Sequence, residues 1–428
     1  MVSSEPRLPF TLEEYGLSPH SGFLPQEWPV TELNDYYYHP WEIIVAKLPA
    51  LITGGTLRYE VDKLPILAVS EEILGNIPQL RRCYSLLCFI ANAYVWGSEI
   101  PCEILPDSIA QPLLIVSEEL GLPPLSTYAS LILWNFKESV DEYKISNLID
   151  PIHVSIINTF TGLVDESWFY IISIFYEKIG GSCLLSGMNI LEAIQDNNKD
   201  RVTVELQKVS ENIIILGDLF KRMDEKTDPD VFYNTLRPFL AGWENMSDSG
   251  LSNGVKYGRN GEYKKFAGGS NAQSSLIQFL DILLNVKHNP TGSKNEKPET
   301  DSSSKFRPKS YIYEMRNYMP KIHREFLENF SNICNVKEFV FSNKENLSLY
   351  QSYEKCLDEL KMFRDKHMQL VTRYIIKPAK KRAIEGSENK NTKEASGLAI
   401  TGTGSTSFVL FLKQCRDDTA KTLTSGLQ

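Results

Sequence analysis

Apolar residues recur at helical spacing along most of this chain. From about residue 70 onward they return every three or four positions, which places them on one face of successive helices. Alternation of apolar and polar residues is scarce, and a short ribbon at residues 57–61 is the best strand candidate. The pattern predicts an all-α protein.

The expected helices differ in how far their apolar faces extend. Residues 167–179 are apolar nearly all round, which predicts a helix buried on most sides that ends or breaks at Gly180 and Gly181. Residues 228–243 open with an aspartate and a proline, which are typical of a helix start. Further helices are expected at residues 79–96, 126–137, 191–220 and 276–286.

One histidine lies on the apolar stripe of a long helix expected at residues 353–377, ending before Pro378. Steps of three and four residues join Cys356, Leu360, Phe363, His367, Leu370 and Tyr374. A buried imidazole must satisfy both ring nitrogens. His367 is either a core histidine bonded to a backbone carbonyl, which periodicity alone favours, or an axial ligand of haem iron whose other nitrogen is held by an acceptor.

Two other features bear on a metal site. His323, Glu325 and His367 formally match the ligand set of some non-haem iron oxygenases, but residues two apart on a helix face in different directions. Arg364 lies three residues before His367 on adjoining helix surface, where its guanidinium suits the carboxylates of a haem. The alternative for Arg364 is a charge that faces solvent.

Length and local composition suggest how the chain is divided. With 428 residues, two domains are expected, which we place at residues 1–155 and 156–428. Polar stretches rich in Pro, Ser and Lys at about 288–310, opening with His288, and at about 379–402 are expected to be disordered excursions of the larger domain.

Composition and charge narrow the class of protein. The net charge of -9 argues against nucleic acid or an anionic membrane as the main partner. No apolar run approaches the roughly 18 residues of a membrane span, and the N-terminus does not read as a signal or transit peptide. The seven cysteines form no C-x-x-C pair and suit a reducing compartment. A cytoplasmic protein is therefore expected.

Six segments, taken in order, resemble the indoleamine 2,3-dioxygenase family, most closely its fungal members. They are PPLSTYASLILWNF (123–136), FYNTLRPFLAGW (232–243), FAGGSNAQSS (266–275), RNYMPKIHREFL (316–327), KMFRDKHMQLVTRYIIKPA (361–379) and GTGSTSFVLFLK (402–413). The resemblance covers roughly residues 30–420. It implies a two-domain all-α fold, a smaller N-terminal domain and a larger helical domain that holds one haem b.

The resemblance also implies a reaction and its partners. The expected activity is opening of the indole pyrrole ring of L-tryptophan by O₂, giving N-formyl-L-kynurenine as the first step of kynurenine and NAD biosynthesis. The iron would be ferrous, kept so by an external electron donor, and a monomer is expected. No side chain needs to act as an acid or a base, in agreement with the absence of a Ser-His-Asp or paired-carboxylate signature.

By the same resemblance, His367 is the proximal iron ligand and Arg237 pairs with the substrate carboxylate. Phe232 packs on the indole, and the remaining pocket residues are Phe169, Ser173, Tyr128, Leu131 and Ile132. The alternatives are a surface ion pair for Arg237, ordinary core for residues 167–179, and a hydroxyl bonded back to its own helix for Ser173.

The cofactor and lid assignments follow from the resemblance as well. Gly268, Gly269 and Ser270 pass close over the haem, or else form a helix entry turn capped by Ser270. Asp281 is the acidic partner of Arg364 on the propionate side. A lid that closes over the amino acid is expected at Thr403, Gly404 and Ser405.

This chain departs from the family pattern at a few pocket positions. Asn271 stands where many relatives have a small apolar residue, Ser405 stands in a glycine position and Leu131 replaces a smaller residue. These departures bear on substrate affinity rather than on the haem site. A catalytically inactive haem-binding relative and a helical scaffold without cofactor remain as alternatives.

Overall fold

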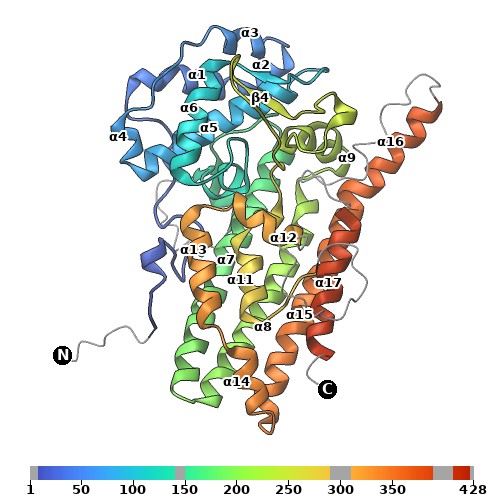
Figure 1. Cartoon of the computed structure of the whole chain (residues 1–428). Helices are drawn as coiled ribbons and strands as arrows, with labels where there is room; N and C mark the ends of the chain where they lie inside the picture. Colours follow the sequence, from blue (N-terminus) through green and yellow to red (C-terminus); the bar gives the residue numbers. More distant parts are fainter. Residues whose placement is uncertain (1–7, 140–149, 290–309, 389–407, 425–428) are drawn as a thin grey trace, which may run out of the picture.

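The computed structural model describes residues 8–139, 150–289, 310–388 and 408–424. These residues are mostly helical, with a few strands of two or three residues each (Figure 1). The all-α prediction is therefore confirmed. Strand β2 (Phe136–Glu138) pairs antiparallel with β3 (Val154–Ile156), while β4 (Val255–Tyr257) pairs with both β1 (Ile104–Leu105) and β5 (Tyr263–Lys264).

The first helices gather around α5, at the top of Figure 1. Helix α5 (Ile77–Trp96) is buried along most of its length, because it contacts neighbours on several sides. These are α1 (His39–Ala46), α2 (Leu48–Thr53), α3 (Leu57–Asp62), α4 (Glu71–Leu74) and α6 (Asp107–Leu120).

Long helices lying side by side form the lower half of the molecule in Figure 1. Helix α8 (Lys199–Arg222) packs between α7 (Val164–Gln195) and α15 (Leu347–Val371), and α17 (Phe408–Thr424) lies along α15. The remaining helices are shorter: α9 (Pro229–Val231), α10 (Arg237–Leu240), α11 (Ser275–Leu283), α12 (Tyr311–Glu314), α13 (Lys321–Ile333), α14 (Val336–Ser342) and α16 (Lys377–Glu388).

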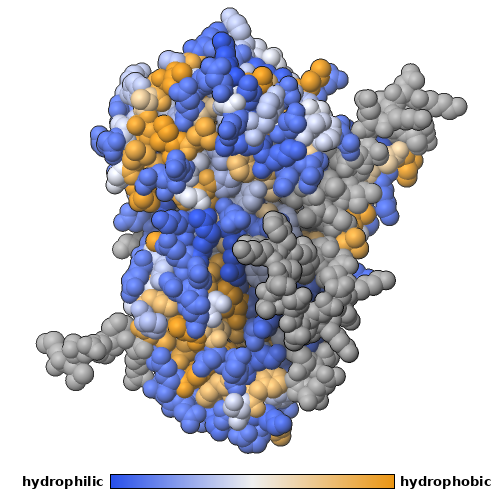
Figure 2. All heavy atoms as spheres, in the orientation of Figure 1, coloured by the Kyte–Doolittle hydropathy of each residue, from blue (hydrophilic) through white to orange (hydrophobic). Residues whose placement is uncertain are grey.

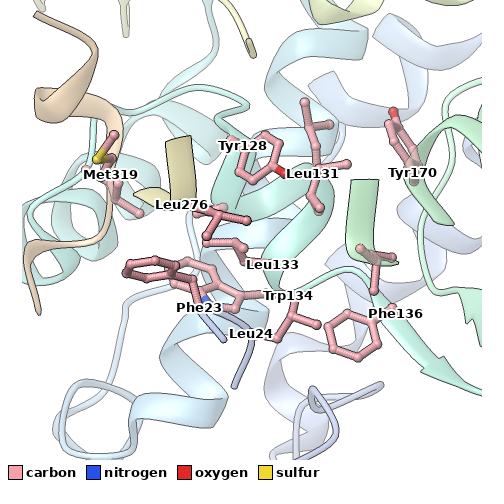
Figure 3. Packing of buried hydrophobic residues seen from close by; sticks show 14 of the residues in the cluster. Phe23, Leu24, Tyr128, Leu131, Leu133, Trp134, Phe136, Tyr170, Leu276 and Met319 are labelled. Atoms are coloured by element: carbon pink, nitrogen blue, oxygen red, sulfur yellow. The ribbon is translucent and has the colours of Figure 1, made fainter. Parts of the chain in front are cut away.

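Segments of the chain cross between these halves in both directions. Near the N-terminus, the Phe10 ring lies 6.1 Å from the ring of Phe326 on α13, and Phe23 lies 5.0 Å from the ring of His323. Figure 3 shows Phe23 in one buried cluster with Trp134 and other apolar side chains. In the other direction, β4 pairs with β1 of the first half. The domain boundary at residue 155 stays a prediction.

The strand expected at residues 57–61 is wrong, because these residues form the helix α3. Leu57 and Val61 are four positions apart, so a helix places both on one face, and both are buried. Contact with α5 thus selects the helix over an alternation that spans only a few residues.

The expected helix break at Gly180 and Gly181 is also wrong, since α7 runs through both residues. A Cβ on Gly180 would overlap the side chain of Leu276, and one on Gly181 would come within 2.6 Å of the Pro19 carbonyl oxygen. The glycines therefore serve close packing rather than helix termination.

Two other expected helices have irregular backbones. Residues 126–137 contain only a π-helical turn, Ala129–Leu133, before β2 begins. Residues 228–243 divide into α9, a second π-helical turn at Phe232–Leu236, and α10. The long helix of His367 does not end before Pro378 as expected. A π-helical turn, Thr372–Ile376, leads directly into α16. This wider turn lets the helix continue through Pro378, which has no backbone N–H to donate.

Both predictions of disorder need correction at one end. His288 is buried rather than at the start of a surface excursion, and residues 379–388 belong to α16. The rest of these excursions lies outside the described residues.

No helix in the described part of the chain is long and apolar enough to cross a membrane. Figure 2 shows hydrophilic side chains over most of the visible face, with apolar side chains in separate groups.

Candidate functional site

A large, mostly apolar cavity lies where the long helices meet the segment 128–132 and the loop 269–274. The volume of the cavity is about 190 Å³, more than ten times the roughly 10–15 Å³ that one water molecule requires. Its walls come from α7, α8, α15 and α17, and they include the predicted pocket residues Tyr128, Leu131, Ile132, Phe169, Ser173 and Phe232.

His367 of α15 faces this cavity. Its ring stacks on Phe220, with 5.5 Å between ring centroids and 27° between planes. Among the described residues, neither ring nitrogen has a hydrogen-bond partner, so no backbone carbonyl in that part of the chain holds the imidazole. Burial, together with the charge of Arg364, lowers the pKa of His367 to about 4. The ring is therefore neutral at physiological pH, the form that binds a metal.

The described residues contain no group of three or more His, Cys, Asp or Glu side chains arranged to hold a metal ion. His323 and His367 therefore do not share the three-ligand site considered for non-haem iron. His323 instead packs on Phe23, and its Nδ1 lies 3.3 Å from the hydroxyl of Ser275. A single available imidazole suits a metal whose other ligands belong to a cofactor, as in haem.

Arg364 also lines the cavity and forms the expected ion pair with Asp281, at 2.5 Å. It further donates to the backbone carbonyl of Cys415, at 2.8 Å, and to the hydroxyl of Thr419, both on α17. Burial disfavours the Asp281 carboxylate, but the charges of Arg364 and His288 outweigh it and lower the pKa of Asp281. Asp281 does not itself line the cavity.

The ion pair continues into a buried network that the sequence did not indicate. His288 Nε2 lies 2.8 Å from Asp281, and its Nδ1 lies 3.7 Å from Asp418 of α17. Burial disfavours the charged imidazole, yet Asp281 and Asp418 outweigh it and raise the pKa of His288 to about 11. Helices α11, α15 and α17 are thus held together by alternating charges behind the cavity wall.

Aromatic rings and one arginine form another part of the cavity wall. Phe232 packs edge-on against Phe169 at 5.0 Å and against Tyr374 at 5.7 Å. Arg237, the first residue of α10, is 5% exposed, and its guanidinium carbon lies 5.1 Å from the centre of the Tyr233 ring. Burial lowers the pKa of Arg237. Arginine nevertheless keeps its charge in proteins, so a cation lies at a mostly apolar wall.

The Ser173 hydroxyl donates to the backbone carbonyl of Phe169, at 3.0 Å. This is the alternative considered from the sequence, in which the hydroxyl bonds back to its own helix. The hydroxyl proton is therefore used in a hydrogen bond inside α7.

Neighbouring parts of the protein leave no room for larger side chains at Gly268 and Gly269 of the glycine-rich loop. A Cβ on Gly268 would overlap the backbone at Leu240 and Gly242, and one on Gly269 would come within 2.6 Å of a Leu131 methyl group. Ser270 caps the short 3₁₀ helix Asn271–Gln273, accepting from the N–H of Ala272 at 3.2 Å. Gly269, Ser270 and Asn271 line the cavity, whereas Gly268 does not.

The predicted lid residues, Thr403, Gly404 and Ser405, lie outside the described residues. A site residue that the sequence analysis missed is Glu177 of α7, which is fully buried. Its Oε1 atom accepts hydrogen bonds from Tyr128, at 3.0 Å, and from Ser274, at 2.5 Å. The only sequence signal was a carboxylate within a segment that is apolar nearly all round.

Comparisons with known proteins agree on one family. The family model described as indoleamine 2,3-dioxygenase matches residues 11–422. The chain is 46% identical to the indoleamine 2,3-dioxygenase of Saccharomyces cerevisiae, over 96% of this chain and 93% of the relative. It is 40% identical to an indoleamine 2,3-dioxygenase of Aspergillus nanangensis, over 95% and 96% of the two chains. It is 35% identical to a 6-hydroxytryptophan 2,3-dioxygenase of Fusarium equiseti, over 97% and 98%.

Proposed function

This chain belongs to the indoleamine 2,3-dioxygenase family, and from that membership we propose that it binds one haem b and opens the indole pyrrole ring of L-tryptophan with O₂ to give N-formyl-L-kynurenine. The observation that carries the proposal is the neutral imidazole of His367, which faces a large apolar cavity and has no hydrogen-bond partner in the described part of the chain.

The residues of the cavity fit a haem. His367 would hold the iron through one ring nitrogen, and stacking on Phe220 fixes the plane of its ring. Apolar side chains cover most of the remaining wall, as the faces of a flat macrocycle require. Arg364 lies at the wall with its charge held by Asp281, where a propionate would find a cation. When bound, the haem supplies an iron centre that activates O₂.

The part of the cavity lined by Arg237, Phe169 and Phe232 fits an amino acid with an aromatic side chain. Arg237 is the cation for the substrate carboxylate, because a planar guanidinium binds a carboxylate through two parallel hydrogen bonds. Phe169 and Phe232 offer ring surfaces to the indole, and Leu131 closes the floor. These side chains exclude water and orient the indole, while the Ser173 hydroxyl keeps its proton within α7.

Asn271 places an amide at the cavity wall. Since the Fusarium equiseti relative is named for a hydroxylated tryptophan, we include substituted indoles among the substrates to be compared. The cytoplasmic location, the monomeric state and the external electron donor accompany the proposal as expectations.

A spectrum followed by turnover on one sample tests this function. Purified protein supplied with haem is expected to show a Soret band that shifts when CO is added to the reduced form. The same sample, reduced and mixed with L-tryptophan in air, is expected to accumulate N-formyl-L-kynurenine. A Soret band without turnover would leave a catalytically inactive haem protein, and no Soret band would leave a helical scaffold.

A further inference from the structure

The carboxyl group of Glu177 is fully buried, and it forms hydrogen bonds with two residues that line the cavity. Tyr128, on the segment that precedes β2, and Ser274, on the loop before α11, line the cavity and donate to the same oxygen of Glu177. The other oxygen, Oε2, has no hydrogen-bond partner among the described residues. One buried side chain thus joins two segments that are far apart in the sequence.

The N-terminal turn, residues 18–22, packs against α7 at Glu177. Gly22 lies so close to α7 that an added Cβ would overlap the backbone carbonyl of Glu177. Gly22 also has a positive φ of 65°, which favours glycine at this position. The turn therefore packs against the backbone of α7 at this point, while the carboxyl group is fully buried and its hydrogen-bond donors among the described residues are the two cavity-lining hydroxyls.

A second buried carboxylate on the same helix shows what a purely structural arrangement looks like. Glu166, also fully buried, accepts from the N–H of Phe160, from the N–H and hydroxyl of Thr161, and from the hydroxyl of Tyr170, at 2.6–3.0 Å. Both of its oxygens are satisfied, and none of these partners lines the cavity. In Glu177, by contrast, only one of the two carboxyl oxygens accepts hydrogen bonds from the described residues. Leaving a buried oxygen unpaired costs free energy, which indicates a role other than structural support.

We propose that Glu177 is a positioning residue that fixes the hydroxyls of Tyr128 and Ser274 and thereby sets the shape of the indole subsite according to its own protonation. The proposal rests on the proposed function. It adds a residue that does not line the cavity and acts through two that do.

The surroundings of Glu177 support a change of protonation near neutral pH. Burial raises its pKa to about 7, offset in part by the hydrogen bonds from Ser274 and Tyr128. The titratable side chains that face it, Tyr128 and the neighbouring Tyr176, have pKa values raised well above 10 and stay neutral. The N-terminal turn contributes backbone at this point, and its His20 is exposed to solvent.

The direction of the effect follows from the two hydroxyl donors. The carboxylate is a stronger acceptor than the acid, so both hydroxyls are held firmly above pH 7 and less firmly below it. The KM for tryptophan is therefore expected to fall as the pH rises through 7. A change of about two- to tenfold corresponds to one net hydrogen bond.

The test compares haem-loaded wild type with Glu177→Gln over pH 6 to 8.5. Glutamine stays neutral throughout, so the variant is expected to keep its haem and to show the high KM of the acidic wild type at every pH. Glu166→Gln is the matched control, a buried carboxylate of the same helix, and is expected to keep the wild-type profile. A Glu177→Gln profile parallel to that of the wild type, or equal flattening by Glu166→Gln, would overturn the proposal.

Ser274→Ala provides a second test that does not depend on the folding of Glu177→Gln. Removing this donor destabilises the carboxylate, so the midpoint of the KM profile is expected to move to higher pH. An unmoved or lower midpoint contradicts the role of Glu177. A wild type that binds no haem or yields no N-formyl-L-kynurenine contradicts the proposed function instead, so the two failures are distinguishable.

Discussion

The imidazole of His367 lies stacked on the ring of Phe220, with 5.5 Å between centroids, and lines the cavity without a hydrogen-bond partner among the residues that the structure describes. The stacking partner comes from α8 and the imidazole from α15, so the packing of two long helices fixes the orientation of the ring.

His367→Ala is expected to abolish the Soret band, because it removes the one imidazole that lines the cavity. His323→Ala is the matched control, since His323 is also a buried, neutral histidine, whose pKa burial lowers to about 3. It should lose stability but retain haem. Absorbance after haem titration measures both, and undiminished haem binding by His367→Ala would assign the ligand to another residue.

Arg237→Ala is expected to weaken tryptophan binding by about 2–5 kcal/mol while the haem spectrum stays unchanged, because a buried charge pair with the substrate carboxylate is lost. Arg237→Lys should recover part of this loss through its charge but not the two parallel hydrogen bonds. The measurement is the tryptophan dissociation constant from the absorbance of the haem. Wild-type affinity in Arg237→Ala would remove its role at the carboxylate.

His288→Asn is expected to destabilise the fold by roughly 3 kcal/mol at pH 6, because Asp281 and Asp418 lose a buried cationic partner. The pKa of His288 is raised from 6.5 to about 11, so its contribution is fully present below pH 6.5 and is lost as the pH rises towards 11. Denaturant unfolding of both proteins should therefore show a gap that narrows from pH 6.5 to 10. A gap that widens with pH would show that His288 is neutral in the folded state.

Gly181→Ala is expected to destabilise the protein by about 1–3 kcal/mol, although alanine favours helices, because its methyl group would meet the backbone of Pro19 and Gly22. Gly217→Ala in α8 is the control, since its methyl group would meet only the flexible chain of Lys366, at 3.1 Å. That variant should be neutral or up to about 1 kcal/mol more stable. Thermal unfolding separates the two, and a Gly181→Ala protein more stable than wild type would refute the packing explanation.

Several features of the molecule follow from local pattern in the sequence. Repeats of three and four residues predicted the helical fold, and the stripe through Phe363, His367 and Tyr374 placed the histidine on a buried face of a long helix. The resemblance of ordered segments indicated the family, which the comparisons confirm. It also indicated the pairing of Asp281 with Arg364, which the structure contains. Their role towards a cofactor stays a proposal.

Other features depend on residues that are distant in the sequence. The partners of His288 include Asp418, and Glu177 bonds to Tyr128 on one side and Ser274 on the other. Gly180 and Gly181 looked like a helix end because a local pattern does not show that Leu276 and the N-terminal turn press against them.

The sequence by itself therefore determined the helical class, the family and the helix that bears His367, because periodicity and motif order are local properties of the chain. Only the tertiary structure decided where α7 and the helix of His367 continue, and that His288 and Asp418 join the buried charges around Asp281. Helix continuity at the two glycines, and the charge of a buried side chain, depend on neighbours that the folded chain brings together from distant parts of the sequence.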